Sequence, residues 1–144
     1  MSTFTPDLSQ YPEVVQYRTT LYPEVGWIAF ADLSLGRAEV HYHGDTGYGF
    51  SHEMGHAAAY ILGIEGALAL LVMKQPGAQN PRNENIFCYG AQQLEVHDWD
   101  RAMAEYAATA IQYYTDAPGE LPRPVFEFIR SAFEAAKGDT SVQD

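Results

Sequence analysis

Two histidines and a glutamate lie close together in the first half of the chain. They are His52, Glu53 and His56, so the histidines are four residues apart and the glutamate follows the first of them. On an α-helix, residues at positions i and i+4 lie on the same face, one turn apart. The two imidazoles can therefore bind one metal ion, and Glu53 can take a proton from a water molecule on that ion. The spacing predicts metal-assisted hydrolysis.

The same pattern, His-Glu-x-x-His, is typical of zinc peptidases, so we expect Zn²⁺ as the cofactor. A catalytic zinc takes three protein ligands and leaves one position for water. His52 and His56 therefore leave one ligand to find. The metzincin spacing would need a histidine at position 62, where this chain has Leu62, and that family is excluded. The remaining candidates are downstream acids, among which spacing alone does not choose: Glu65, Glu84, Glu95, Asp98, Asp100 and Glu105.

A second histidine pair, His41 and His43, alternates along an expected strand. Such a pair can present two ligands to one metal. It also fits a solvent-facing strand end before a Gly-Asp turn, and we favour this interpretation because His52 and His56 have the better spacing. Either His41 or His43 can still line a substrate cleft. Four tyrosines near the expected cleft are unranked candidates for a donor to the reaction's oxyanion: Tyr42, Tyr48, Tyr60 and Tyr89.

The charge balance indicates what the chain does not bind. Eight lysines and arginines stand against nineteen acids, which gives a net charge of −11. No basic residues cluster, so we expect no nucleic-acid partner. The acidity favours solubility and suits a divalent cation. We expect a peptide or protein as substrate and, for a chain this short, a partner protein or a second copy of the chain to help present it.

The sequence also indicates a cytoplasmic location. Cys88 is the only cysteine, so no internal disulfide forms and a reducing compartment fits. The first residues have neither a basic nor an apolar leader pattern. The longest apolar run, Ala67 to Met73, is too short to cross a bilayer, and we expect no membrane span.

The elements around the histidine pair follow from the hydrophobic periodicity. We expect a short helix from Pro12 through Tyr22, then a β-hairpin of Val25–Ala31 and Arg37–His43. The histidine helix should cover about Tyr48 to Leu62 and end at Gly63 in a left-handed cap. Gly55 lies inside that helix, at a cost of roughly 1 kcal/mol against alanine, so we expect another backbone to pack closely there.

Beyond Gly63, the segment Ile64–Lys74 is either a second helix or a buried strand. A loop from Gln75 to about Gly90 is long enough to border a binding cleft. Two amphipathic helices then follow, one from Asp98 or a little earlier to about Tyr114 and one from Pro124 to Gly138. The expected fold is α+β: a mainly helical single domain, residues 1–138, with a small hairpin or sheet beside the histidine helix and a disordered tail at 139–144.

Two resemblances suggest the third ligand. Phe50-Ser51-His52-Glu53-Met54-Gly55-His56-Ala57 resembles the zinc helix of FtsH-type membrane proteases, and His97-Asp98-Trp99-Asp100-Arg101-Ala102 resembles the segment that supplies their ligand aspartate. This resemblance implies that His52, His56 and Asp98 bind zinc and that Glu53 is the general base. The helix also resembles that of the ImmA/IrrE zinc peptidases, in which a glutamate is the third ligand. Ala104-Glu105-Tyr106-Ala107-Ala108 is loosely similar to their glutamate segment.

Asp98 has an ordinary structural explanation as well, because aspartate often caps a helix N-terminus. Asp98 and Glu105 are seven residues apart and share one helical face, so either can point at the metal. We therefore expect a zinc metallopeptidase with Asp98 as the third ligand and with Glu105 or Asp100 as alternatives. The competing hypothesis is a non-catalytic binding or interaction protein of zincin fold with an acidic surface.

Overall fold

Helices make up most of the structure, a computed structural model that describes residues 6–15, 18–21, 29–33, 38–42 and 48–142. Within this part of the chain there are five α-helices: α1 (Tyr48–Leu62), α2 (Glu65–Met73), α3 (Cys88–Glu95), α4 (Trp99–Asp116) and α5 (Arg123–Val142). The strands are β1 (Arg18–Leu21), β2 (Ala29–Asp32) and β3 (Glu39–Tyr42), and the 3₁₀ turns are η1 (Leu8–Gln10), η2 (Glu13–Val15) and η3 (Pro118–Glu120). The fold is the expected mainly helical α+β domain.

The three strands form one small sheet in the order β1-β3-β2. β2 and β3 pair antiparallel, as the expected hairpin requires, with Ala31 opposite Val40. Residues 25–28, 37 and 43 of that hairpin lie outside the described residues. β1 pairs parallel to β3 on the other side. Val40 is fully buried, and Tyr42, two residues on and hence on the same face, packs edge-on against Phe50 of α1 with ring centroids 5.2 Å apart. This face of the sheet therefore lies on α1.

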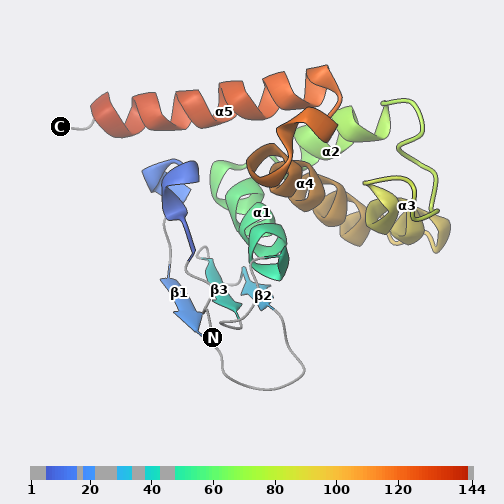
Figure 1. The fold of residues 1–144 in the computed structure, drawn as a ribbon, viewed down its shortest axis with the longest axis horizontal. Helices are drawn as coiled ribbons and strands as arrows, with labels where there is room; N and C mark the ends of the chain where they lie inside the picture. The colour runs from blue at the N-terminus through green and yellow to red at the C-terminus, as the bar shows by residue number, and fades with distance from the viewer. Residues whose placement is uncertain (1–5, 16–17, 22–28, 34–37, 43–47, 143–144) are drawn as a thin grey trace.

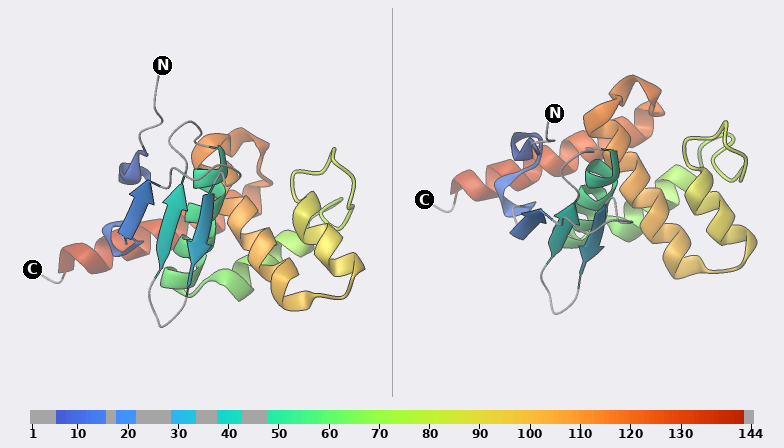
Figure 2. Two further views of the ribbon diagram at one scale, coloured as in Figure 1. Left: turned by 90° about the horizontal axis from the view of Figure 1, so that it is seen from below. Right: turned by 60° about the horizontal axis from the view of Figure 1, so that its bottom comes forward.

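Helix α1 is the central element, because it packs against the sheet, α2 and α4. In Figure 1 it lies between the strands and α4, with α5 across the top of the view. Figure 2 shows the three strands side by side next to α1. The core between these layers consists of aliphatic and aromatic side chains from four helices, among them Met54, Leu68, Ile111, Val125, Ile129 and Phe133. A helix with this many neighbours holds its side chains in fixed positions.

The helix boundaries near the histidine pair agree with the sequence pattern. α1 spans the expected residues, and Gly63 ends it with φ at +69°. The amide of Gly63 donates to the carbonyl of Tyr60 and that of Ile64 to the carbonyl of Ala59, which is the paired capping of a Schellman motif. Ile64–Lys74, which the periodicity left open between helix and strand, contains helix α2.

Three expectations about elements are wrong. The helix from Pro12 stops after one 3₁₀ turn at Val15, and β1 follows, because its β-branched Thr19 and Thr20 suit a strand. The loop after α2 ends at Phe87, about three residues earlier than its expected limit, and the helix α3 that follows was not expected. Gly138 does not end the last helix, since α5 continues to Val142. Gly90 of α3 packs closely against α4: an added Cβ there would lie 2.7 Å from the buried ring of Tyr106.

Candidate metal centre

The centre begins with a very close contact between α1 and α4. A Cβ placed on Gly55 would lie 2.3 Å from the carbonyl oxygen of Ala108, a distance that real side chains do not adopt. Gly55 therefore lets the two helix backbones touch, which confirms the close packing expected there. Gly55 lies between His52 and His56 along the chain, and Ala108 is one turn after Glu105. The contact consequently brings Glu105 to the histidines.

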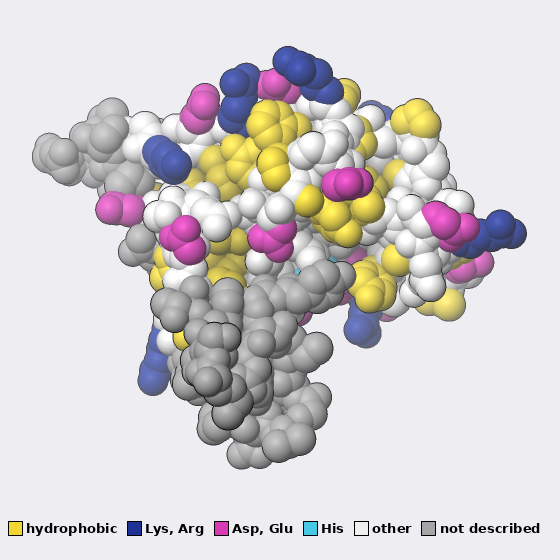
Figure 3. Space-filling view, viewed as in Figure 1, with side chains coloured by type: hydrophobic (Ala, Val, Ile, Leu, Met, Phe, Trp, Pro, Cys, Tyr) yellow, Lys and Arg dark blue, Asp and Glu magenta, His cyan; other side chains and the backbone are white. Residues whose placement is uncertain are grey.

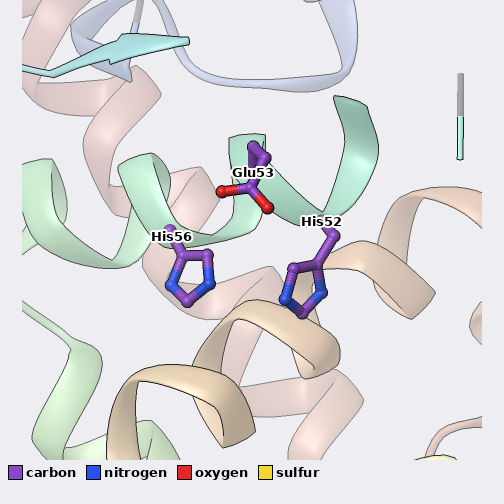
Figure 4. A group of neighbouring side chains, drawn as sticks. All are labelled: His52, Glu53 and His56. Carbon is purple, nitrogen blue, oxygen red and sulfur yellow. The ribbon is translucent and has the colours of Figure 1, made fainter. Parts of the chain in front are cut away.

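One carboxylate of α4 meets both imidazoles of α1. Oε2 of Glu105 is 3.0 Å from Nε2 of His52, and Oε1 is 3.3 Å from Nε2 of His56. The two rings lie edge to face with centroids 4.9 Å apart. Figure 4 shows both rings projecting from the same side of α1 toward the neighbouring helix. All three side chains are 13–19% exposed, so the donors converge at a half-buried position that solvent reaches.

Further groups hold this set in place. Nδ1 of His52 is 2.9 Å from Oε1 of Gln112, which is two turns beyond Glu105 on α4. The backbone of Ala31, on β2, lies near the carboxylate of Glu53 and partly offsets the raising of its pKa by burial. The ring of Tyr89, from α3, lies edge-on to the His52 ring at 6.4 Å between centroids. Residues from the sheet, α3 and α4 thus surround the side chains of His52 and Glu53 on α1.

The ionisation of the centre reflects this crowding. Burial alone would lower the pKa of His52, but the hydrogen bond and the charge of Glu105 outweigh it and raise that pKa above its ordinary value. Burial would raise the pKa of Glu105, yet its hydrogen bonds to His52 and His56 hold it well below its usual range. Burial raises the pKa of the Glu53 carboxyl, and the nearby histidines only partly oppose this. The two glutamates therefore differ: Glu105 stays ionised while Glu53 is closer to gaining a proton.

Asp98, which the resemblance suggested as the third ligand, lies at the N-terminus of α4; no described contact brings it to the histidine pair, and its role as a ligand stays a prediction. Its carboxylate accepts from the backbone amide of Arg101, 3.2 Å away, so Asp98 is the N-cap of α4 and is exposed to solvent. The preceding residue, His97, has φ at +59°, and the amides of His97 and Asp98 close a Schellman motif at the end of α3. Seven residues of helix separate Asp98 from Glu105 by about 10 Å along the axis. The two acids share one face of the helix but lie too far apart along it to meet the same histidines, and Glu105 is the one in contact with them.

The other candidates have separate positions. Among the described residues, no contact brings Glu65, Glu84, Glu95 or Asp100 to the histidine pair. Nε2 of His41 lies 3.8 Å from Glu39, two residues away on the face of β3 opposite Val40. His43 and the side chain of Tyr48 lie outside the described residues. Among the tyrosine candidates whose side chains are described, Tyr89 has a ring contact to His52, whereas Tyr42 packs against Phe50.

Gln112 is the residue that the sequence pattern did not single out. A signal was present: Glu105, Thr109 and Gln112 are polar residues at helical spacing within the otherwise apolar stripe of α4. Polar side chains on a core-facing stripe need partners, and the histidines of α1 supply them for two of the three.

The donor set fits a metal ion. Ligand atoms of His52, Glu53 and His56 lie within 4.8 Å of one another, and Glu105 touches Nε2 of both histidines. Ligands about 2.0–2.1 Å from a tetrahedral zinc lie roughly 3.3 Å apart, close to the Glu105–imidazole distances. We take Glu105 rather than Glu53 as the carboxylate of this set because it contacts both rings directly. Two imidazoles and a carboxylate suit Zn²⁺ and other first-row divalent ions.

Comparison of the chain with protein-family models, with curated proteins and with solved structures finds no match. The two resemblances therefore stay predictions from short segments. No single helix in the described ranges is long and apolar enough to span a membrane, and α1 with α2 reaches that length only as a pair bent by 119°. On the face shown in Figure 3, acidic and basic side chains are scattered among apolar ones and form no large patch of one sign.

Proposed function

We propose that the protein is a zinc-dependent metallopeptidase. The observation that carries the proposal is the carboxylate of Glu105 within 3.3 Å of Nε2 of both His52 and His56. Together these residues supply the three protein ligands that a catalytic zinc uses. The assignment of Glu105 favours the resemblance to the ImmA/IrrE group over that to FtsH-type proteases, because the glutamate segment rather than the aspartate segment faces the histidines.

The protein's own residues would divide the work. His52, His56 and Glu105 would hold the ion, which when bound supplies a Lewis acid and lowers the pKa of water to about 7. Glu53 would accept a proton at its carboxylate and hand it to the leaving amine. Its raised pKa supports this role, because a general base that is too weak cannot take the proton. The nearby backbone of Ala31 would help to keep the carboxylate aimed at the ligand side of α1.

A strand edge beside Glu53 supports a peptide as the substrate. β2 lies at the edge of the described sheet, and the backbone of its residue Ala31 is close enough to the Glu53 carboxylate to offset part of the rise in its pKa. An extended peptide can add to such an edge through main-chain hydrogen bonds, whatever its side chains. A peptide bound in this way would run alongside the general base.

Metal analysis and one substitution test the proposal. Protein purified without chelator should contain one zinc ion per chain and hydrolyse a mixed fluorogenic peptide library. Glu53→Gln should keep the zinc and lose hydrolysis by about 100-fold or more, because only the proton acceptor is removed. Glu84→Gln, an exposed acid on the 74–87 loop, is the matched control and should behave as wild type.

Two outcomes would contradict the proposal. Absence of bound metal would remove its basis. Bound zinc without hydrolysis of any peptide, together with a biological effect that Glu53→Gln leaves unchanged, would favour the non-catalytic binding protein instead.

A further inference from the structure

Gln112 is one of the two polar side chains that are buried in the described part of the chain. It is 6% exposed, on the face of α4 that meets α1. Burying an amide without a hydrogen bond costs roughly 1–3 kcal/mol, so its placement needs a partner. That partner is Nδ1 of His52, at 2.9 Å from Oε1. The backbone carbonyl of Gln112 also accepts from the hydroxyl of Thr115, 2.9 Å away.

The direction of this hydrogen bond has a chemical consequence. The amide oxygen can only accept, so Nδ1 of His52 must carry the proton. When the ring is neutral, its other nitrogen, Nε2, then has a free lone pair. That nitrogen is the one that points at Glu105. A hydrogen bond to the far side of a ligand imidazole also fixes the rotation of the ring.

We propose that Gln112 is a positioning residue of the metal centre, which sets the tautomer and orientation of His52 so that Nε2 faces the ion. This inference rests on the proposed metal site, but its failure can be told apart from the failure of that site. Gln112 does not touch the ion; it acts through His52. It also explains why a glutamine is buried in the mostly apolar stripe of α4.

Zinc affinity of three variants, measured by competition with a chromophoric chelator, tests the inference. Gln112→Met keeps the volume but removes the acceptor, and should weaken zinc binding by about 10–100-fold. Gln112→Glu keeps an acceptor oxygen at this position, and its zinc affinity should lie within a few-fold of wild type. Thr109→Val is the matched control, since Thr109 is 2% exposed on the same helix and its hydroxyl has no partner among the described residues. It should leave the affinity unchanged.

A second measurement does not depend on how the variants fold. In the zinc-loaded wild-type protein, two-bond ¹H–¹⁵N correlations of His52 should show a protonated Nδ1 and a metal-bound Nε2. Zinc bound through Nδ1 would overturn the inference. So would wild-type affinity in Gln112→Met, or equal losses in the Met and Glu variants, which would indicate packing rather than hydrogen bonding. If the wild-type protein itself binds no zinc, the proposed function fails and this inference fails with it.

Discussion

Two acids, Glu105 in α4 and Asp98 at its N-cap, each have a histidine nearby, but their surroundings differ. At the middle of α4, Glu105 faces His52 and His56 across a backbone contact at Gly55 that leaves no room for a side chain. At the beginning of α4, Asp98 caps the helix beside His97, and the next residue, Trp99, is 58% exposed. Glu105 thus meets histidines from a distant part of the chain, whereas Asp98 is only next to a histidine in the sequence.

The comparison shows what makes an acid available as a ligand. The carboxylate of Asp98 accepts from the helix N-terminus, and this bond satisfies a backbone amide that has no partner within the helix. The oxygens of Glu105 are directed at two imidazoles from another helix, at a position that water reaches only in part. Sequence resemblance alone favoured the first acid. In the structure, Glu105 is the acid of the two that contacts the histidine pair.

The largest expected effect separates these two acids directly. Glu105→Gln should weaken zinc binding by more than about 100-fold, because even partners outside the coordination sphere change affinity by about 10–100-fold. Asp98→Asn should leave zinc affinity unchanged, and the fold as well, since asparagine caps a helix as well as aspartate does. Chelator competition on both variants measures this. The reverse ranking would restore Asp98 as the ligand.

A smaller effect, on the free energy of unfolding, is expected when either of two glycines is replaced by alanine. Gly55→Ala should lower the free energy of unfolding by about 1–2 kcal/mol: forcing the helices apart costs roughly 1–3 kcal/mol, and alanine's helix propensity returns up to about 1 kcal/mol. Gly138→Ala, in α5, should instead raise it by about 0.5–1 kcal/mol, because a Cβ there meets nothing within 4 Å. Urea unfolding of both variants checks the signs. Equal stabilisation by the two substitutions would show that the Gly55 contact is not tight.

The fold was predictable where local signals agreed. The periodicity of the histidine helix, its Gly63 cap and the β2–β3 pairing were all expected from the sequence and are observed. The parallel strand β1 was not, because its partner β3 lies about twenty residues away and four residues carry little period. Likewise α3 was not expected: it has only eight residues, and its Gly90 packs closely against the ring of Tyr106, far along the chain.

The site was predictable only in the part that one helix carries. The residues of α1 come with fixed spacing, so His52, Glu53 and His56 could be named together. Glu105 could be named only as an alternative, since its approach depends on the Gly55–Ala108 contact between two helices. Gly55 was expected to meet another backbone, yet nothing local showed which one. Gln112 had a signal in the polar interruption of the α4 stripe, but its partner lies sixty residues away.

The smallest expected effect is the pH dependence of the metal-free protein. The lowered pKa of Glu105 stabilises the fold above the ordinary value, 4.5, and this contribution is lost as the pH falls toward the folded pKa. The raised pKa of His52 stabilises the fold below the ordinary value, 6.5, and that contribution is lost as the pH rises through the folded pKa. The pair should therefore contribute most between pH 4.5 and 6.5.

Urea unfolding of the metal-free protein across this range, beside Glu105→Gln, measures that contribution. The variant should lose stability mainly inside the window, and its profile should be flatter there than that of wild type. Asp98→Asn should keep the wild-type shape, because its carboxylate faces no histidine of the pair. Parallel profiles for wild type and Glu105→Gln would mean that the carboxylate and the imidazoles do not interact in solution. Adding zinc should move the pH of greatest stability upward, since the ion replaces the proton on Nε2 of His52.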